Sequence, residues 1–466
     1  MSDDNASLAP VRGKARIDVI DILRGIAILG IFYMNIPFMG NSGILGTTDV
    51  RRIGWSLADQ RVWSFIEITW NGTQRGLLEL LFGAGAMVLT ARAMRPDGPV
   101  AVADLFYRRN LWLLAFGLID IFLIGWIGDI LHIYALAALF IFPFRKLSAR
   151  VLILLGLVYA VGSGFGVIGG GGYMEYRDRT ELMQTAEAAR TKQEAKKPLS
   201  GQETKALAEW QKKVDRFDLS KPLDKEFKQF HEQEVKAHRA GPLEFLPWTW
   251  GTWKFVFVDD HGSFFGVLEA IGGMFIGMAL WKLGVIQGLR SKGFYAALTI
   301  AAYAVGCGLR GYGVMELLPF TPAPKIYWII DEFARLAVTL GHVGLVNLLV
   351  QTRVGKKALS PFKAAGQTAF SLYFLTSILG LWVIFAPWGL NLWAVYSWAG
   401  LAAIATVVIA LLLILANIWT IWFLTGPLEW AWRSLAYWQL QPFRRHHGQA
   451  TLPAEPGTEA NPALPT

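Results

Sequence analysis

An aspartate and a histidine three positions apart are the first residues of this chain that suggest chemistry. They lie in the segment Gly128-Asp129-Ile130-Leu131-His132, at the start of an apolar run. On a helix this spacing places both side chains on one face, where a carboxylate fixes the imidazole tautomer that a general base needs. The structural alternative is that Asp129 caps the helix and that His132 makes an ordinary hydrogen bond. The spacing alone leaves both interpretations open.

Further polar residues stand inside two other apolar runs. In the run near 17–39, Asp21 and Arg24 share a face, and Asn35 lies three turns farther along that face. An ionisable group at membrane depth costs several kcal/mol unless it is paired or hydrated. We therefore expect this face to contact either a polar cavity or a structural partner, such as an ion pair near the interface.

The run near 326–350 repeats the pattern. Glu332 is three residues from Arg335, and His342 follows Arg335 by one heptad, so the three side chains form one stripe. Such a stripe faces a hydrated path or partner helices rather than lipid. Its alternative interpretation is interhelical hydrogen bonding.

The composition places these runs in a membrane. Of 466 residues, 54% are hydrophobic and 17% are charged, and the charges are gathered into blocks. The net charge of +9 then favours cytoplasmic loops against anionic lipid rather than nucleic-acid binding. The single cysteine, Cys307, excludes a disulfide within the chain. The acidic segment around His261 lacks a recognised ligand spacing, so we expect no metal.

The apolar runs predict an all-α polytopic membrane protein with about ten transmembrane helices. The expected spans are 17–39, 76–93, 107–126, 130–144, 151–168, 264–283, 294–309, 326–350, 364–387 and 401–424. With ten spans, every short basic loop falls on one side, which places both termini in the cytoplasm. We expect localisation in a bacterial inner membrane.

One long charged segment interrupts the spans. Residues 173–243 carry mixed charge and many helix formers, which predicts a large extracytoplasmic helical insertion. It separates an N-terminal membrane half (1–172) from a C-terminal half (244–445), which opens with an aromatic interfacial segment. The remainder, 446–466, has the composition of a disordered tail.

Six motifs in order resemble the YeiB-type family of bacterial membrane proteins, a domain of unknown function. They are RIDVIDILRGIAILGIFYMN (16–35), LLFGAGAMVLTAR (80–92), RRNLWLLAFGLIDIFLIGWIGDILHIYA (108–135), IGMALWKLGV (276–285), GQTAFSLYFLTS (366–377) and GPLEWAWRSLAYWQLQPFRR (426–445). The charged insertion is outside the resemblance.

That family is distantly similar to transmembrane acyltransferases, which share Asp-x-Leu-Arg-Gly in the first span and a polar residue eleven positions after the arginine. The resemblance implies a cytoplasmic acyl-CoA (acetyl-CoA) donor and an extracytoplasmic sugar or envelope acceptor. The candidate cofactor-binding residues are Arg24, Arg108, Arg109 and Arg335. The candidate catalytic residues are His132, Asp129, His342 and Asn35.

Two other functions remain open. The polar faces would also suit a transporter or permease for a small solute or lipid, and a non-catalytic scaffold needs no cavity at all. The two halves show no convincing inverted repeat, which favours the enzyme over a transporter. A tunnel from the Arg108 region to the Asp129–His132 region would favour acyl transfer. The oligomeric state is open, a homodimer included.

Overall fold

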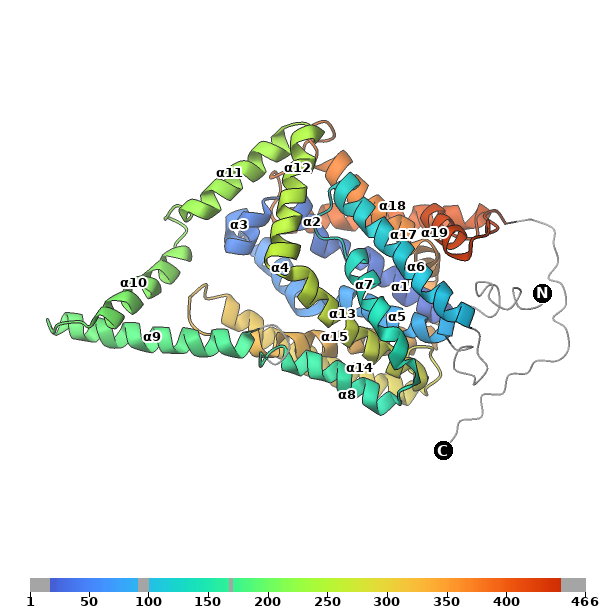
Figure 1. Cartoon of the computed structure of the whole chain (residues 1–466), viewed down its shortest axis with the longest axis horizontal. Coiled ribbons are helices and arrows are strands. Elements are labelled where there is room, and N and C mark those ends of the chain that lie inside the picture. The colour runs from blue at the N-terminus through green and yellow to red at the C-terminus, as the bar shows by residue number, and fades with distance from the viewer. Residues whose placement is uncertain (1–16, 91–99, 167–170, 446–466) are drawn as a thin grey trace.

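The computed structural model describes residues 17–90, 100–166 and 171–445, which form a helical protein (Figure 1). No β-strand occurs in these residues, apart from one isolated bridge between Phe423 and Arg444. The expected disordered tail and the basic residues at 12–16 lie outside the described part of the chain. So do Arg92 and Arg95.

The N-terminal half is built from helices at the expected spans. They are α1 (Asp18–Gly30), α2 (Phe32–Gly40), α5 (Thr73–Thr90), α6 (Val100–Ile119), α7 (Leu131–Ile141) and α8 (Ala149–Gly162). Helix α6 continues into a π-helical turn, η5 (Asp120–Ile124). Short elements without a counterpart in the predicted spans lie between α2 and α5: α3 (Gly43–Thr48), η3 (Val50–Ile53) and α4 (Leu57–Thr69).

The C-terminal half follows the same plan. Its helices are α12 (Pro242–Trp253), η7 (Lys254–Asp259), α13 (Gly262–Lys282), α14 (Lys292–Leu317), α15 (Tyr327–Val350), α16 (Arg353–Gln367), α17 (Ala369–Ile378), η8 (Leu379–Ile384), α18 (Trp398–Trp422) and α19 (Pro427–Tyr437). The span expected at 364–387 is not one straight helix. Its first residues belong to the end of α16, and the chain then bends by 77° before α17 and η8.

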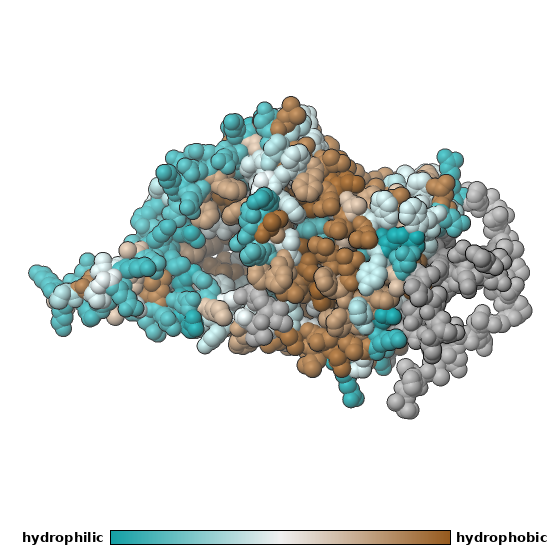
Figure 2. Space-filling view, in the orientation of Figure 1, coloured by the Kyte–Doolittle hydropathy of each residue, from teal (hydrophilic) through white to brown (hydrophobic). Residues whose placement is uncertain are grey.

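Several helices have the length and composition of membrane spans. Among the described residues, five stretches qualify: Asp18–Gly40, Gly262–Lys282, Lys292–Leu317, Tyr327–Val350 and Trp398–Trp422. The bent pair would make a sixth. An apolar surface covers the middle of the molecule and gives way to hydrophilic surface over the insertion (Figure 2). These are features of a membrane protein, while the total of ten spans stays a prediction.

The charged insertion forms three helices that project from one end of the bundle (Figure 1). Helix α9 (Gly172–Glu194) leads out, α10 (Gly201–Arg216) begins at a Ser200–Glu203 capping box, and α11 (Lys225–Arg239) leads back to α12. The carboxylate of Glu234 in α11 accepts hydrogen bonds from Ser42 Oγ and from the Gly43 amide at the start of α3. This contact ties the returning helix to the bundle.

Small residues allow the helices that carry the motifs to touch. A side chain at Gly366 of α16 would run into the backbone carbonyl of Asp21 in α1, and one at Gly25 would meet the carbonyl of Phe362. The first and fifth motifs are thus packed backbone against backbone, which positions Arg24 beside the start of α17.

Candidate functional site

Asp129 and His132 form a buried pair just before and within the first turn of α7. Asp129 Oδ2 lies 2.9 Å from His132 Nδ1 and accepts a hydrogen bond from the His132 amide at 2.8 Å. The aspartate therefore caps the helix and orients the imidazole at once, so the two interpretations of the spacing are compatible. His132 Nε2 is buried and has no hydrogen-bond partner in the described chain.

Two residues that sequence reasoning missed complete the setting of this pair. The Tyr373 hydroxyl accepts from the Ile130 amide at 3.1 Å and donates to Asp129 Oδ1 at 3.2 Å. A Cβ on Gly117 of α6 would stand 2.7 Å from the His132 amide and 2.8 Å from Asp129 Oδ2. Tyr373 belongs to the fifth family motif and Gly117 to the third. Membership of these motifs is the sequence signal that could have identified both residues.

A second buried aspartate lies nearby on the π-helical turn of η5. The Asp120 side chain is fully buried, and its Oδ2 is 3.4 Å from Ser377 Oγ. Its Oδ1 has no hydrogen-bond partner in the described chain. Single π-helical turns within α-helices are frequent at functional sites, which fits the polar surroundings of the Asp129–His132 pair.

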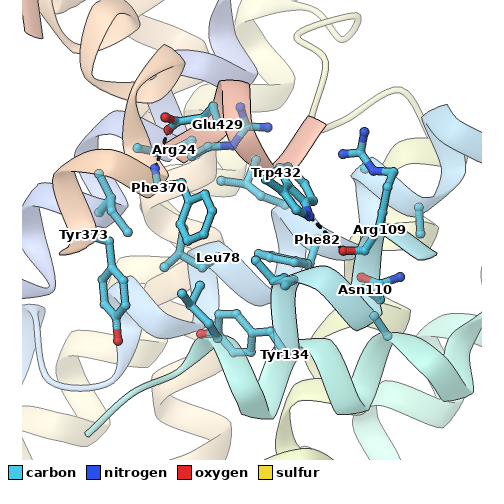
Figure 3. Close-up of a pocket in the computed structure, with 18 of the residues that line it drawn as sticks. Arg24, Leu78, Phe82, Arg109, Asn110, Tyr134, Phe370, Tyr373, Glu429 and Trp432 are labelled. Atoms are coloured by element: carbon cyan, nitrogen blue, oxygen red, sulfur yellow. Dashed lines mark hydrogen bonds between the residues drawn. The ribbon is translucent and has the colours of Figure 1, made fainter. Parts of the chain in front are cut away.

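A cavity of about 220 Å³ ends at residues next to the Asp129–His132 pair, among them Tyr373 (Figure 3). It lies between α1, α5, α6, α7, α17 and α19. Its polar end is lined by Arg24, Arg109, Asn110, Glu429 and Arg433. Its apolar wall includes Leu78, Leu81, Phe82, Leu89, Phe106 and Leu113. The other end is lined by Ile130, Leu131, Tyr134 and Tyr373.

The polar end is held together by contacts between distant motifs. Arg24 pairs with Asp21 at 3.1 Å, as the spacing predicted. The Arg109 guanidinium lies 4.3 Å from the centre of the Trp432 ring, and Trp432 Nε1 donates to the Arg109 carbonyl at 2.8 Å. Arg24, Arg109 and Arg433 thus line one end of an amphiphilic cavity, an arrangement suited to an anionic head with an apolar tail.

Glu429 explains the break between α16 and α17. Its buried carboxylate accepts from the Phe370 amide at 2.6 Å and from Ser371 Oγ at 2.6 Å. It satisfies amides that a helix N-terminus leaves unpaired, so α17 can begin inside the protein. The fifth and sixth family motifs meet at this contact.

Of the candidate residues, Arg24 and Arg109 line the cavity, whereas Asp129 and His132 lie behind its Ile130–Leu131 end and the others lie elsewhere. Arg108 pairs with Asp104 at 3.1 Å. Asn35 is buried in α2. His342 Nδ1 is 2.7 Å from the Tyr303 hydroxyl, and its Nε2 is 3.0 Å from the Thr69 carbonyl. The face shared by Arg335 and His342 therefore contacts partner helices, the second of the two interpretations of this stripe.

Arg335 belongs to a separate ionic cluster with residues from α5 and α13. Its Nη2 atom lies 2.5 Å from Glu332 Oε1, 3.0 Å from Glu269 Oε1 and 3.4 Å from Glu79 Oε2. Glu269 also pairs with Arg75 Nη2 at 2.7 Å. Sequence spacing predicted only the contact within α15, because the other partners are far away in the chain.

Comparison with known proteins agrees with the family resemblance. Residues 280–439 match the family model described as a protein of unknown function (DUF418). We refer to the matched residues as the DUF418 region. It supplies Tyr373, Glu429 and Trp432 to the cavity, whereas Arg24, Arg109 and Ile130 precede it, so the cavity forms between the DUF418 region and the N-terminal half.

The similarity to other proteins extends beyond the DUF418 region. The chain is 27% identical over 449 residues to the uncharacterized protein YxaH of Bacillus subtilis (strain 168), covering 94% of this chain and 99% of YxaH. It is 30% identical over 149 residues to an uncharacterized 39.9 kDa protein in the amylase 3' region of Bacillus acidopullulyticus. That alignment covers 32% of this chain and 40% of the relative. No solved structure matches the chain significantly.

Proposed function

We propose that the chain is an acyltransferase of the bacterial inner membrane. In this proposal ten spans carry it, both termini are cytoplasmic, and an acyl group passes from cytoplasmic acyl-CoA to an extracytoplasmic sugar or other envelope acceptor. The observation that carries the proposal is the cavity between the Arg24–Arg109 end and the residues flanking the Asp129–His132 pair.

Contacts between the predicted cytoplasmic loops support this orientation. Lys282 Nζ donates to the Leu147 carbonyl at 2.6 Å, and Lys363 pairs with Asp18 at 2.7 Å. Both contacts join residues at or near the span ends that the charge pattern assigns to the cytoplasm. The charged insertion projects from the bundle at the end opposite α19 (Figure 1).

Each part of the donor has a suitable place in the cavity. Arg24 and Arg109 would bind phosphate groups through charge-assisted hydrogen bonds. The apolar wall of leucines and phenylalanines would hold the acyl chain and exclude water. The thioester carbonyl would then lie toward Ile130 and Tyr373, next to the reacting pair.

In the proposed step, His132 Nε2 accepts the proton of the acceptor hydroxyl. The hydroxyl oxygen bonds to the thioester carbon, the carbon–sulfur bond breaks, and the departing CoA sulfur takes up the proton. Asp129 holds Nδ1 and stabilises the imidazolium. The rings of Trp253 and Phe257 lie 5.8 and 5.5 Å from the imidazole. These two rings, from the aromatic segment α12–η7, cover the imidazole. Binding of the acceptor must therefore displace the two rings.

The proposal is tested by turnover of labelled acetyl-CoA. The purified chain in lipid nanodiscs is incubated with the thioester and candidate sugar acceptors, and CoA release, hydrolysis and binding are measured. We expect binding and CoA release that His132→Gln abolishes while binding persists. Absence of binding and turnover, or equal turnover by the wild type and His132→Gln, would contradict the proposal.

A transporter for a small solute or lipid remains the second candidate, because the amphiphilic cavity also suits a lipid with an anionic head. Transport predicts movement of the cavity's ligand across the bilayer without covalent change. Acyl transfer predicts cleavage of the thioester, so product analysis in the same experiment separates the two functions.

A further inference from the structure

A second buried polar site lies on the far side of α5 from the cavity. Leu78 and Leu81 face the cavity, whereas Glu79 faces α13 and α15. There, three carboxylates (Glu79, Glu269 and Glu332) surround two guanidinium groups (Arg75 and Arg335). With all five groups ionised, three negative charges face two positive charges, so the cluster would hold one uncompensated negative charge.

An uncompensated charge is expensive in this setting. The side chain of Glu79 is 2% exposed and that of Arg335 is 6% exposed. Two of the helices around them, α13 and α15, have the composition of membrane spans. A buried carboxylate without a full complement of partners loses several kcal/mol of solvation. A single proton bound to the cluster would remove this cost.

The geometry identifies where that proton resides. Glu79 Oε1 is buried and has no hydrogen-bond partner within the described residues. It is 3.8 Å from Arg75 Nε, too far for a hydrogen bond. Glu79 Oε2 and Glu269 Oε1 lie 3.4 and 3.0 Å from the same Arg335 Nη2 atom, so the two carboxyl groups are neighbours. Two neighbouring carboxyl groups can share a hydrogen bond only when one of them is protonated.

The site also has room for exchange. A cavity of about 10 Å³, enough for one water molecule, is lined by Glu79, Glu332, Arg335, Tyr159 and Thr339 among others. From α7, the Tyr134 hydroxyl donates to the Arg75 carbonyl at 3.0 Å. The next carboxylate of α15, Asp331, pairs with Arg310 of α14 instead, at 3.0 Å. Arg310 is therefore paired with Asp331 rather than with the cluster.

We infer that the Arg75–Glu79–Glu269–Glu332–Arg335 cluster is a proton-binding site that holds one proton, shared between Glu79 and Glu269, inside the helix bundle. The site is separate from the acyl-transfer proposal and does not depend on it. A carboxyl proton held at the centre of a membrane protein is the chemistry with which such proteins relay or couple protons.

Infrared spectroscopy tests the site on the full chain in nanodiscs at neutral pH, without any acyl-CoA. We expect the C=O stretching band of a protonated carboxylic acid, and its loss in Glu79→Gln, which keeps the shape of the side chain but has no proton to exchange. Glu187→Gln, on the exposed face of α9, should retain the band.

Proton counting provides a second measurement. On titration from neutral to alkaline pH, the wild type should release about one more proton per chain than Glu79→Gln. Glu269→Gln serves as the second variant if Glu79→Gln does not fold. Absence of the carboxylic-acid band in the wild type, or a band of unchanged intensity in folded Glu79→Gln and Glu269→Gln, would overturn the inference.

Discussion

His132 has one ring nitrogen committed to Asp129 and the other without a hydrogen-bond partner in the described chain. A buried imidazole in a purely structural role normally uses both nitrogens, as His342 does between Tyr303 and Thr69. This difference is why we propose His132, and not His342, as the base.

Replacing the aspartate tests how the pair works. Asp129→Asn should preserve acyl-CoA binding and reduce the rate of acyl transfer by about 10²–10⁴, because the imidazole loses the carboxylate that orients it. Steady-state rates and equilibrium binding measure the two effects. The matched control is His231→Gln in the insertion, which should leave the rate unchanged. Equal rates for Asp129→Asn and the wild type would contradict the assignment.

The cationic end of the cavity gives a prediction about binding. Arg109→Gln should weaken acyl-CoA binding by about tenfold or more, because a charge-assisted hydrogen bond contributes about 1.5–3 kcal/mol. Calorimetric titration at fixed ionic strength measures this. Arg145→Gln removes another cation of the predicted cytoplasmic face that does not line the cavity, and it should bind like the wild type. Similar losses in both variants would indicate only a general charge effect.

The sequence predicted the contacts that lie within one helix turn. The structure contains all three expected contacts: Asp21 with Arg24, Asp129 with His132, and Glu332 with Arg335. The remaining partners come from other helices, as in Arg75 with Glu269, which are 194 residues apart. Local periodicity cannot predict such contacts, because they depend on how the helices pack.

At the scale of helices, the spans at 17–39, 264–283, 326–350 and 401–424 could be drawn from hydropathy, because each is a long continuous apolar run. The break at Thr368 was not predicted. It depends on the Glu429 carboxylate, which reaches the start of α17 from about sixty residues later. The helical elements at 43–69 also escaped prediction because they are short and mixed in composition.

The close contact of α1 with α16 predicts a large effect from one methyl group. Gly366→Ala should lower stability by about 1–3 kcal/mol, because its Cβ would collide with the Asp21 carbonyl. Gly308→Ala is the control: nothing lies within 4 Å of its Cβ position on α14, and it should be neutral or slightly stabilising. Thermal unfolding in detergent compares the two. Equal midpoints would show that α1 and α16 do not pack as described.

The packing of α11 against the bundle predicts that the stability of this contact depends on pH. His238 stacks on Trp393 with ring centroids 4.4 Å apart and also contacts Phe245 and Trp248. Burial lowers the pKa of His238 to about 3. Because this folded value is below the unfolded value of about 6.5, the contact is fully stable above about pH 6.5 and loses stability as the pH falls toward 3.

Between about pH 6.5 and 5 the loss should be about 1–2 kcal/mol. Hydrogen exchange of α11, corrected for the intrinsic pH effect, measures it. His238→Phe keeps the stacking but cannot be protonated, so its α11 should show a smaller loss of protection. Burial raises the pKa of Glu234 on the same helix, but that contribution is common to both proteins and cancels. Identical pH profiles would contradict the burial of His238.

At the scale of the whole molecule, the cavity and the ionic cluster lie on opposite sides of α5, and the insertion caps the end of the bundle away from α19 (Figure 1). The DUF418 region provides one wall of the cavity and the N-terminal half the other. Neither half alone would form the site, which agrees with the extension of the similarity to YxaH over 94% of the chain.

Photochemical labelling with an acyl-CoA analogue that carries a diazirine on its acyl chain tests the central claim most directly. After irradiation in nanodiscs, we predict that the label attaches to peptides of α5, α6, α7 and α17 and that excess CoA prevents the labelling. Labelling confined to the lipid-facing surface, or to α15 around Arg335, or labelling unaffected by CoA, would contradict acyl-CoA binding in this cavity.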